Sequence, residues 1–186
     1  MIRKYLDEDK FEEIKNSDNL IFKALELVTI LFENDTDKGG FPYILHLMYV
    51  YKHVSTIEEK TVALLHDVIE DTPVSDFEIE QEFGNEILLL VQGVTKLSKL
   101  NFKTREEAQA ENLRRMFLAM SNDIRIIIIK LADRLNNMRT LDFKDDEAKR
   151  RISQETLDIY APIASRLGIA SIKGELEDLS FKYLHP

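Results

Sequence analysis

Apolar residues recur along most of the chain at the three- and four-residue spacing of an amphipathic helix. Residues 20–32 fit this spacing closely and end in a polar segment that closes with Gly39 and Gly40. No segment shows the strict alternation of a half-buried strand. The pattern therefore predicts an all-α fold of about eight to ten helices. Besides 20–32, helices are expected at about 43–54, 57–71, 75–83, 85–93, 105–120, 123–139, 145–166 and 172–184.

One of these segments has a composition typical of a strand. Residues 124–129 contain five isoleucines and one arginine, and β-branched residues favour strands. The run continues without a break into residues 130–138, where the apolar spacing is helical and the total length exceeds that of a typical strand. We therefore predict one fully buried central helix here.

Boundary signals support the other expected helices. Pro42 suits the first turn of the helix at 43–54, Ser55 or Thr56 can cap the next one, and the Thr72-Pro73 step ends it. The segments around Gly39-Gly40 and at 98–104 are expected to be mobile loops. Since no linker or repeat divides the sequence, residues 1–186 are expected to form a single domain.

Composition narrows the possible function. The 186 residues include no cysteine, which excludes disulfides, thiolate metal sites and cysteine nucleophiles and fits a reducing compartment such as the cytoplasm. No apolar run approaches the ~20 residues of a membrane span, and the N-terminus does not resemble a signal peptide. Neither membrane insertion nor secretion is expected, and no oligomeric state is indicated.

Charge is distributed unevenly. Residues 1–93 carry 8 basic and 20 acidic side chains, whereas residues 94–186 carry 17 and 14, and the sum is the net charge of −9. A nucleic-acid-binding protein needs a basic surface to neutralise phosphates, and this chain has none of that extent. An anionic small-molecule substrate would instead need a local site, such as a metal ion with a few Lys or Arg side chains.

The most informative of the four histidines is His66. It is followed by Asp67, Glu70 and Asp71, so an apolar helix suddenly presents an imidazole and three carboxylates near its C-terminal end. The helix dipole disfavours acidic groups there, and a bound cation would compensate for this cost. Imidazole and carboxylate ligands together suit Zn, Mn or Fe better than Ca.

Two residues elsewhere are candidates to complete such a site. His46 lies on an apolar helix, and Asp133 interrupts the helix predicted to be buried, where an isolated charge is costly. The competing interpretation is purely structural: Asp133 pairs with Arg134 or Arg139, and Asp67 or Asp71 is solvated surface. Spacing alone leaves both interpretations open. His53 and His185 are expected to have no role in the site.

The order His46, His66-Asp67, Asp133 resembles that of the HD-domain metal-dependent phosphohydrolases. Longer strings resemble the hydrolase domain of the RelA/SpoT homologue family, which degrades the alarmones ppGpp and pppGpp. The similarity covers about residues 42–186. The strings that carry it are 66–72, 93–97, 110–116, 130–140 and 155–169.

This resemblance implies an all-helical HD bundle holding one Mn²⁺ through His46, His66, Asp67 and Asp133. It assigns catalysis to Glu70 and Asp71 and implies hydrolysis at the 3′-pyrophosphate, which gives GDP or GTP and pyrophosphate. It also implies nucleotide contacts from Asn137 and Thr140, which lie four and seven residues beyond Asp133 on the same helix face. Arg134 and Lys130 are candidates to offset phosphate charge.

The chain departs from the family pattern in the loop before His46. The family carries an Arg that stacks on guanine and then a Lys that meets phosphate. Here the Lys is matched by Lys38, but Asp37 stands in place of the Arg, and a carboxylate cannot stack as a guanidinium does. Three hypotheses therefore remain: a hydrolase of (p)ppGpp, the same chemistry on (p)ppApp or NADPH, and a catalytically silent module that binds alarmone. The sequence also fits either a complete single-domain hydrolase or the N-terminal part of a bifunctional protein.

Overall fold

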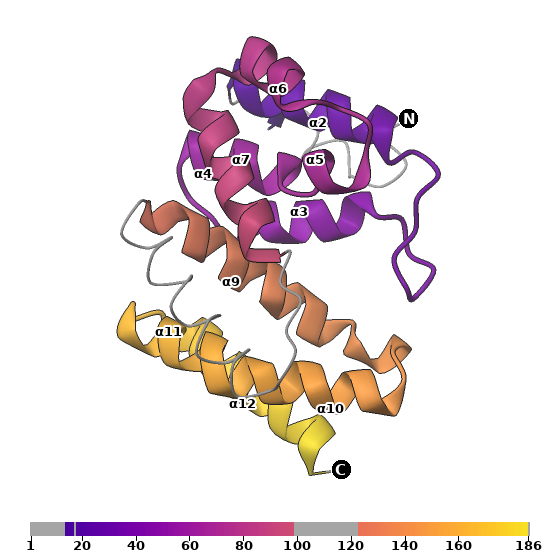
Figure 1. The fold of residues 1–186 in the computed structure, drawn as a ribbon, viewed down its shortest axis with the longest axis vertical. Coiled ribbons are helices and arrows are strands. Elements are labelled where there is room, and N and C mark those ends of the chain that lie inside the picture. Colours follow the sequence, from indigo (N-terminus) through magenta and orange to yellow (C-terminus); the bar gives the residue numbers. More distant parts are fainter. Residues whose placement is uncertain (1–13, 17, 99–122, 186) are drawn as a thin grey trace. The chain divides into compact units, whose positions relative to one another are not determined.

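Helices make up nearly all the regular structure in the residues that the computed structural model describes, which are 14–16, 18–98 and 123–185 (Figure 1). Within them, the only strand-like pairing is an isolated bridge between Thr36 and Pro42. The predicted all-α fold is confirmed. Among the same residues, no helix has the length and apolar character needed to cross a membrane. The chain divides into two compact units, Met1–Ser98 and Lys99–Pro186.

The first unit is organised around α4, which packs against α2, α3 and α7. Its residues Val62 to Leu65 are fully buried. Capping boxes begin two of the helices, with Thr56 paired to Glu59 and Ser75 paired to Glu78. The helices of this unit are α2 (Asn19–Leu31), α3 (Ile44–Lys52), α4 (Ile57–Leu65), α5 (Val68–Asp71), α6 (Asp76–Phe83) and α7 (Asn85–Ser98).

The predicted continuous helix at 57–71 is wrong. The helix is interrupted at His66 and Asp67, which separate α4 from the single turn of α5. The Nδ1 atom of His66 lies 2.9 Å from the carbonyl oxygen of Ala63. In an uninterrupted helix this oxygen would accept the N–H of residue 67, so the side chain competes with the backbone at this point. Asp67, Glu70 and Asp71 therefore do not lie at the C-terminal end of one long helix, where the helix dipole would disfavour them.

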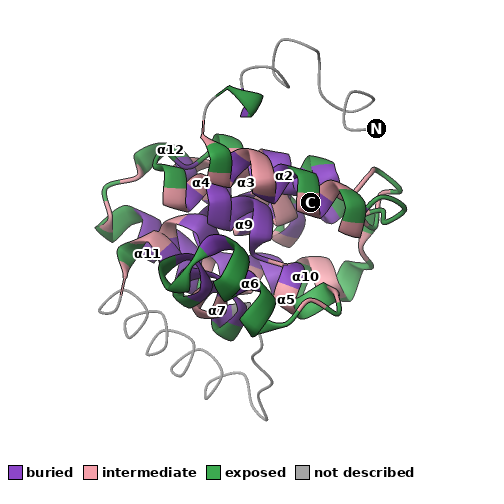
Figure 2. Cartoon of the chain, turned by 90° about the horizontal axis from the view of Figure 1, so that it is seen from above, coloured by how far each residue is buried: buried purple, intermediate pink, exposed green. Residues whose placement is uncertain are grey.

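The second unit contains the helix that resembled a strand by composition, and the helical prediction is confirmed. This helix, α9, runs from Ile124 to Arg139 and packs against α12 and η3. Ile127 and Ile129 are fully buried, and Figure 2 shows α9 coloured as buried along much of its length. The free energy gained by burying the isoleucine side chains therefore outweighs the low helix propensity of β-branched residues. The other elements are η2 (Leu141–Phe143), α10 (Asp146–Glu155), η3 (Thr156–Tyr160), α11 (Ala161–Arg166) and α12 (Ala170–Leu184).

The expected helix at 145–166 contains a turn of π-helix, η3, which apolar spacing did not reveal. A π turn holds more residues than an α turn, and this brings Glu155 and Tyr160 to the same neighbour, Arg134 of α9. Arg134 Nη2 donates to Glu155 Oε2 at 3.1 Å, and its guanidinium carbon lies 4.0 Å from the centre of the Tyr160 ring. The π turn therefore forms a partly buried clamp on α9.

Substitution of Arg134 by alanine tests this clamp. We expect it to lower the free energy of unfolding by about 3 kcal/mol, because Glu155 is left without its partner and the Tyr160 ring loses its stacked cation. The matched control is Arg139→Ala on the same helix. Arg139 pairs with Glu175 at the surface, where loss of an ion pair costs less than about 1 kcal/mol. Chemical denaturation measures both values, and equal losses would contradict the clamp.

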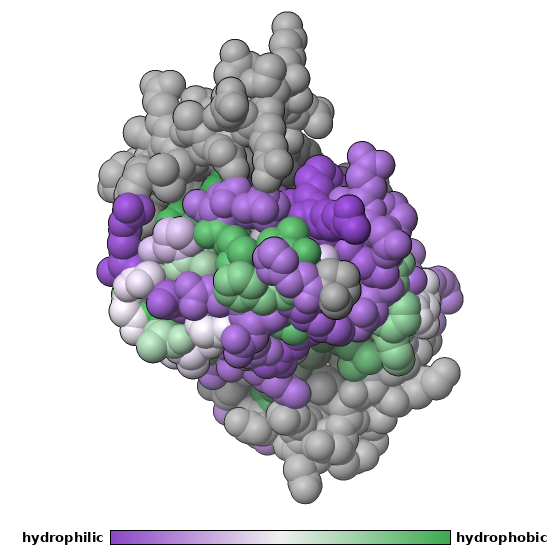
Figure 3. Space-filling view, turned by 90° about the horizontal axis from the view of Figure 1, so that it is seen from below, coloured by the Kyte–Doolittle hydropathy of each residue, from purple (hydrophilic) through white to green (hydrophobic). Residues whose placement is uncertain are grey.

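Several smaller expectations have clear outcomes. The helix expected at 85–93 extends to Ser98, and the one expected at 172–184 begins at Ala170. The helix expected at 105–120 and the polar segment from 99 to 104 lie outside the described residues. Figure 3 shows one face of the molecule, on which hydrophilic side chains surround a limited apolar patch.

Candidate metal centre

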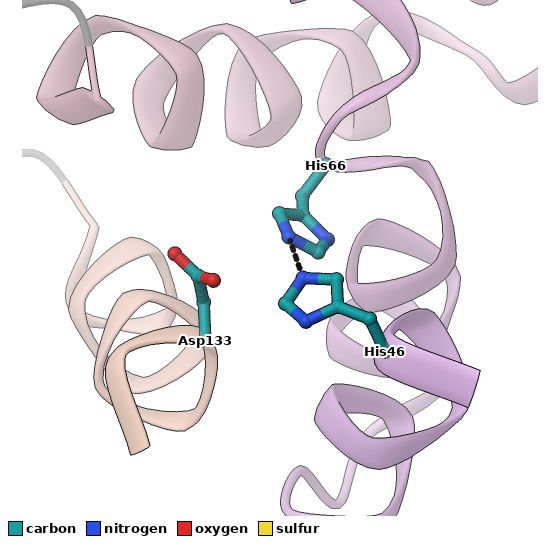
Figure 4. A group of neighbouring side chains, drawn as sticks. All are labelled: His46, His66 and Asp133. Carbon is teal, nitrogen blue, oxygen red and sulfur yellow. Dashed lines mark hydrogen bonds between the residues drawn. The ribbon is translucent and has the colours of Figure 1, made fainter. Parts of the chain in front are cut away.

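Two imidazoles meet in the interior of the first unit. His46 lies on α3, His66 follows the last residue of α4, and these helices pack against each other. The Nε2 atoms of the two rings are 3.3 Å apart, and Figure 4 shows the rings pointing toward each other. The side chains are 9% and 1% exposed. Two buried imidazoles therefore direct nitrogen atoms at one point.

The carboxylate of Asp67 reaches the same point. Its Oδ2 lies 3.0 Å from His66 Nε2 and 3.6 Å from His46 Nε2. A triangle with sides of 3.0, 3.3 and 3.6 Å has a circumradius of about 1.9 Å, so one ion fits at bond lengths of about 2.0–2.2 Å from all three atoms. These three residues fit a divalent cation by distance and by donor type.

Hydrogen bonding directs the ring of His66 toward this point. The carbonyl oxygen of Ala63 can only accept, so the Nδ1 atom beside it carries a proton. In the neutral ring, Nε2 is then left with a lone pair that faces Asp67 Oδ2. That contact is repulsive unless a proton or a cation lies between the atoms. A backbone carbonyl bonded to the second nitrogen is also the usual support of a metal-bound histidine.

The electrostatics of Asp67 agree with this geometry. Burial alone would raise the pKa of its carboxyl, but the neighbouring imidazoles of His66 and His46 lower it by more than burial raises it. The pKa of Asp67 therefore lies well below its ordinary value. The carboxylate is ionised at neutral pH, as a metal ligand must be.

Sequence reasoning missed Tyr43. Its hydroxyl donates to Asp67 Oδ2 at 2.6 Å, and its ring lies 5.4 Å from the ring of His46 and 4.9 Å from that of Phe32, centre to centre. Tyr43 precedes His46 by three residues, which is the spacing of side chains on one helix face. That spacing was the available signal.

Glu70 and Asp71 lie one turn beyond Asp67 in the chain. The backbone N–H groups of both residues donate to the carbonyl oxygen of Asp67, at 3.1 and 2.9 Å. Both side chains are exposed. The short α5 helix thus presents two solvent-accessible carboxylates directly after Asp67 in the chain.

Asp133 lies on α9 of the second unit and is buried (Figure 4). Its Oδ2 accepts a hydrogen bond from Lys130 Nζ at 2.6 Å, and its Oδ1 accepts one from Asn137 Nδ2 at 2.6 Å. The expected structural partners, Arg134 and Arg139, pair instead with Glu155 and Glu175. Burial lowers the pKa of Lys130 but the charge of Asp133 more than restores it, so the pKa is raised and the pair is ionic.

The remaining residues with an expected role in substrate binding differ in exposure. Lys38 is exposed, Asn137 and Thr140 are half-buried, and the Arg134 side chain is 13% exposed. Thr140 is the C-cap residue of α9, and its hydroxyl donates to the carbonyl oxygen of Asn136 at 3.2 Å. Arg134 is engaged by the π turn.

Asp37 has a structural role in the loop that carries Lys38. Its Oδ1 accepts hydrogen bonds from the backbone N–H groups of Gly39 and Phe41, at 2.8 and 2.9 Å. Gly40 has a φ of 78°, which is costly for residues other than glycine. The carboxylate that replaces the family's Arg is therefore used to hold a tight turn.

Comparison with known proteins gives a consistent assignment. Residues 24–170 match the HD domain family. The chain is 54% identical over 171 residues to a probable guanosine-3′,5′-bis(diphosphate) 3′-pyrophosphohydrolase of Synechocystis, which covers 90% of this chain and 22% of that protein. It is 46% identical over 190 residues to the bifunctional (p)ppGpp synthase/hydrolase SpoT of Escherichia coli, which covers 100% of this chain and 26% of that protein. The chain thus spans about a quarter of the length of these relatives.

A solved structure has the same fold. It is that of a metazoan orthologue of SpoT described as hydrolysing ppGpp, and it matches with a TM-score of 0.64 at 24% identity. The match covers 89% of this chain and 95% of the other. At this level of identity the similarity concerns the fold alone.

Proposed function

Because the chain belongs to the HD-domain family, and within it to the RelA/SpoT homologues, we propose that it hydrolyses ppGpp and pppGpp at the 3′-pyrophosphate. The observation that carries the proposal is the triangle of His46 Nε2, His66 Nε2 and Asp67 Oδ2, whose sides match one divalent cation. The names of the full-length relatives support the choice of substrate.

We propose Mn²⁺ as the cation and Asp133 as its fourth protein ligand. Asp133 is buried and accepts a hydrogen bond from Lys130, and it follows His66 and Asp67 in the chain in the order typical of the family. Imidazole and carboxylate donors suit Mn²⁺, and a bound divalent ion polarises a phosphoryl oxygen and lowers the pKa of water. The family match at 24–170 draws on both units and supports a single HD domain over 1–186, with the cytoplasm as its expected location.

Glu70 and Asp71 supply the acid–base chemistry in this proposal. One of the two carboxylates accepts a proton from the attacking water, while the other orients it. The water oxygen bonds to the phosphorus attached to the nucleoside 3′-oxygen, and the bond between that phosphorus and the 3′-oxygen breaks. The departing 3′-oxygen takes up a proton, which the carboxylate that deprotonated the water can return. The products are pyrophosphate and GDP or GTP. Exposure of both side chains on α5 leaves them accessible to water and substrate.

Four residues are proposed to hold the substrate. Lys38, on an exposed turn, contacts phosphate, and Asn137 and Thr140 contact the nucleotide from the C-terminal half of α9. Arg134 offsets phosphate charge through the field of its guanidinium, whose Nη2 already donates to Glu155.

A second substrate follows from Asp37. Asp37 holds the turn in the position where the family has an Arg. This loop therefore has no guanidinium at that position to stack on a guanine base. The same catalytic residues suit an adenine analogue, ppApp, or a nucleotide with a phosphate on a ribose hydroxyl, such as the 2′-phosphate of NADPH. The choice among these nucleotides depends on the base and on the position of the phosphate, and in each case a bond between phosphorus and a ribose oxygen is hydrolysed.

The test is turnover of ppGpp, ppApp and NADPH side by side with the purified chain. With Mn²⁺ we expect ppGpp to give GDP and pyrophosphate, identified by mass. A chelator should abolish this product, and added Mn²⁺ should restore it. Faster turnover of ppApp or NADPH would transfer the assignment to that substrate. Tight binding of ppGpp without any product would instead identify a regulatory module.

A further inference from the structure

The hydroxyl of Tyr43 donates a hydrogen bond to one particular oxygen of Asp67. The distance to Oδ2 is 2.6 Å, typical of a hydroxyl bonded to an ionised carboxylate. Oδ2 is also the oxygen that lies 3.0 and 3.6 Å from the two imidazoles. A carboxylate oxygen accepts in two directions. Tyr43 occupies one of them, and the other faces His46 and His66.

The ring of Tyr43 is itself held in place. It packs between the ring of His46, at 5.4 Å, and that of Phe32, at 4.9 Å, and Phe32 is buried. Its backbone N–H donates to the carbonyl oxygen of Asp35 at 2.9 Å, beside the bridge between Thr36 and Pro42. The hydroxyl thus approaches Asp67 from a ring that is fixed on several sides.

We propose that Tyr43 is a positioning residue for the cation site. By holding Oδ2 of Asp67, it fixes the rotation of the carboxylate and keeps the third donor atom in the triangle before the ion arrives. Without this hydrogen bond the carboxylate would have more freedom to rotate about its last bond, and cation binding would have to stop that motion. The inference rests on the proposed function only in that the three donors bind a cation.

The test is the affinity of the full chain for Mn²⁺, without substrate. Tyr43→Phe keeps the ring and removes only the hydroxyl, and we expect the dissociation constant to rise about 10- to 100-fold. Titration calorimetry measures it, and the spectrum of bound Mn²⁺ by electron paramagnetic resonance reports the altered ligand geometry. With saturating Mn²⁺, the turnover number of the variant should return to within a few-fold of that of the unmodified chain, because the residue acts through the ion.

Tyr51→Phe is the matched control. Tyr51 lies on α3, the helix that Tyr43 precedes, and its ring lies 5.3 Å from Lys60 Nζ. We expect its Mn²⁺ affinity to be unchanged. If Tyr43→Phe binds Mn²⁺ within twofold of the unmodified chain, or if the unmodified chain binds no Mn²⁺, the inference is wrong. If the chain binds Mn²⁺ and Tyr43→Phe weakens that binding but no nucleotide is hydrolysed, the inference stands and the proposed function fails.

Discussion

Replacement of His66 by alanine is expected to lower ppGpp turnover by at least about 10³-fold. A divalent ion contributes several kcal/mol to stabilisation of the transition state, and each 1.36 kcal/mol corresponds to about a factor of ten. His66 supplies one of the three donor atoms of the triangle, and its ring is fixed by Ala63. Without it, the remaining donors bind the ion too weakly to retain it. Initial rates at fixed Mn²⁺, together with the metal content of the purified variant, measure the effect.

His53→Ala is the control of the same residue type. His53 follows the last residue of α3, is exposed, and stacks on Tyr49 with ring centres 4.2 Å apart. Its removal should leave both Mn²⁺ content and turnover unchanged. Circular dichroism separates loss of the ion from loss of the fold in the His66 variant. A folded His66→Ala protein that retains turnover within tenfold of the unmodified chain would contradict the proposed metal centre.

Glu70→Gln and Asp71→Asn are each expected to reduce turnover by about 10² to 10⁴-fold while Mn²⁺ binding stays intact. General acid–base groups contribute effects of that size. An amide has nearly the shape of the carboxylate, so the exposed positions on α5 should tolerate both changes without unfolding. Single-turnover rates measure catalysis and Mn²⁺ titrations measure cation binding. Both are performed on the same preparations, so that an effect of Glu70 or Asp71 on catalysis is separated from an effect on the cation.

Glu80→Gln provides the corresponding control. Glu80 is an exposed carboxylate on α6 and is not among the proposed site residues. Its neutralisation changes the net charge of the protein by the same amount as Glu70→Gln or Asp71→Asn. Turnover should not change. A decrease equal to that of the Glu70 variant would indicate a general effect of charge on substrate attraction, and the assignment of catalysis to α5 would be lost.

Apolar spacing was sufficient to predict most helices because it reports which side chains each helix buries. It correctly identified α9 despite five isoleucines within 124–129, since the helical spacing continued well beyond that run. Apolar spacing failed where a departure from the regular α-helix arises from a hydrogen bond and not from burial. The interruption at His66 depends on Nδ1 and the Ala63 carbonyl, and the π turn at 156–160 depends on backbone pairing. Neither contact changes the apolar pattern.

The candidate site was predictable to a similar degree. Residue type and the resemblance to the HD family singled out His46, His66 and Asp67, which the structure brings together in the first unit. Tyr43 escaped notice because an aromatic residue on an apolar helix face usually belongs to the core, and only the position of its hydroxyl reveals another role. The partners of Asp133 were mistaken for a related reason. Several basic side chains lie close to Asp133 in the sequence, and the tertiary fold determines which of them already pair with other carboxylates.

The interrupted helix brings the side chains of two neighbouring residues together. Side chains of consecutive residues on a regular α-helix diverge by about 100°, yet His66 Nε2 and Asp67 Oδ2 lie 3.0 Å apart. Sequence changes that favour an unbroken helix through 66–67 would therefore raise local stability and at the same time separate these two donor atoms. Selection for thermostability at this junction should thus work against activity, and an engineer seeking a more robust variant would do better to stabilise α9 or the capping boxes.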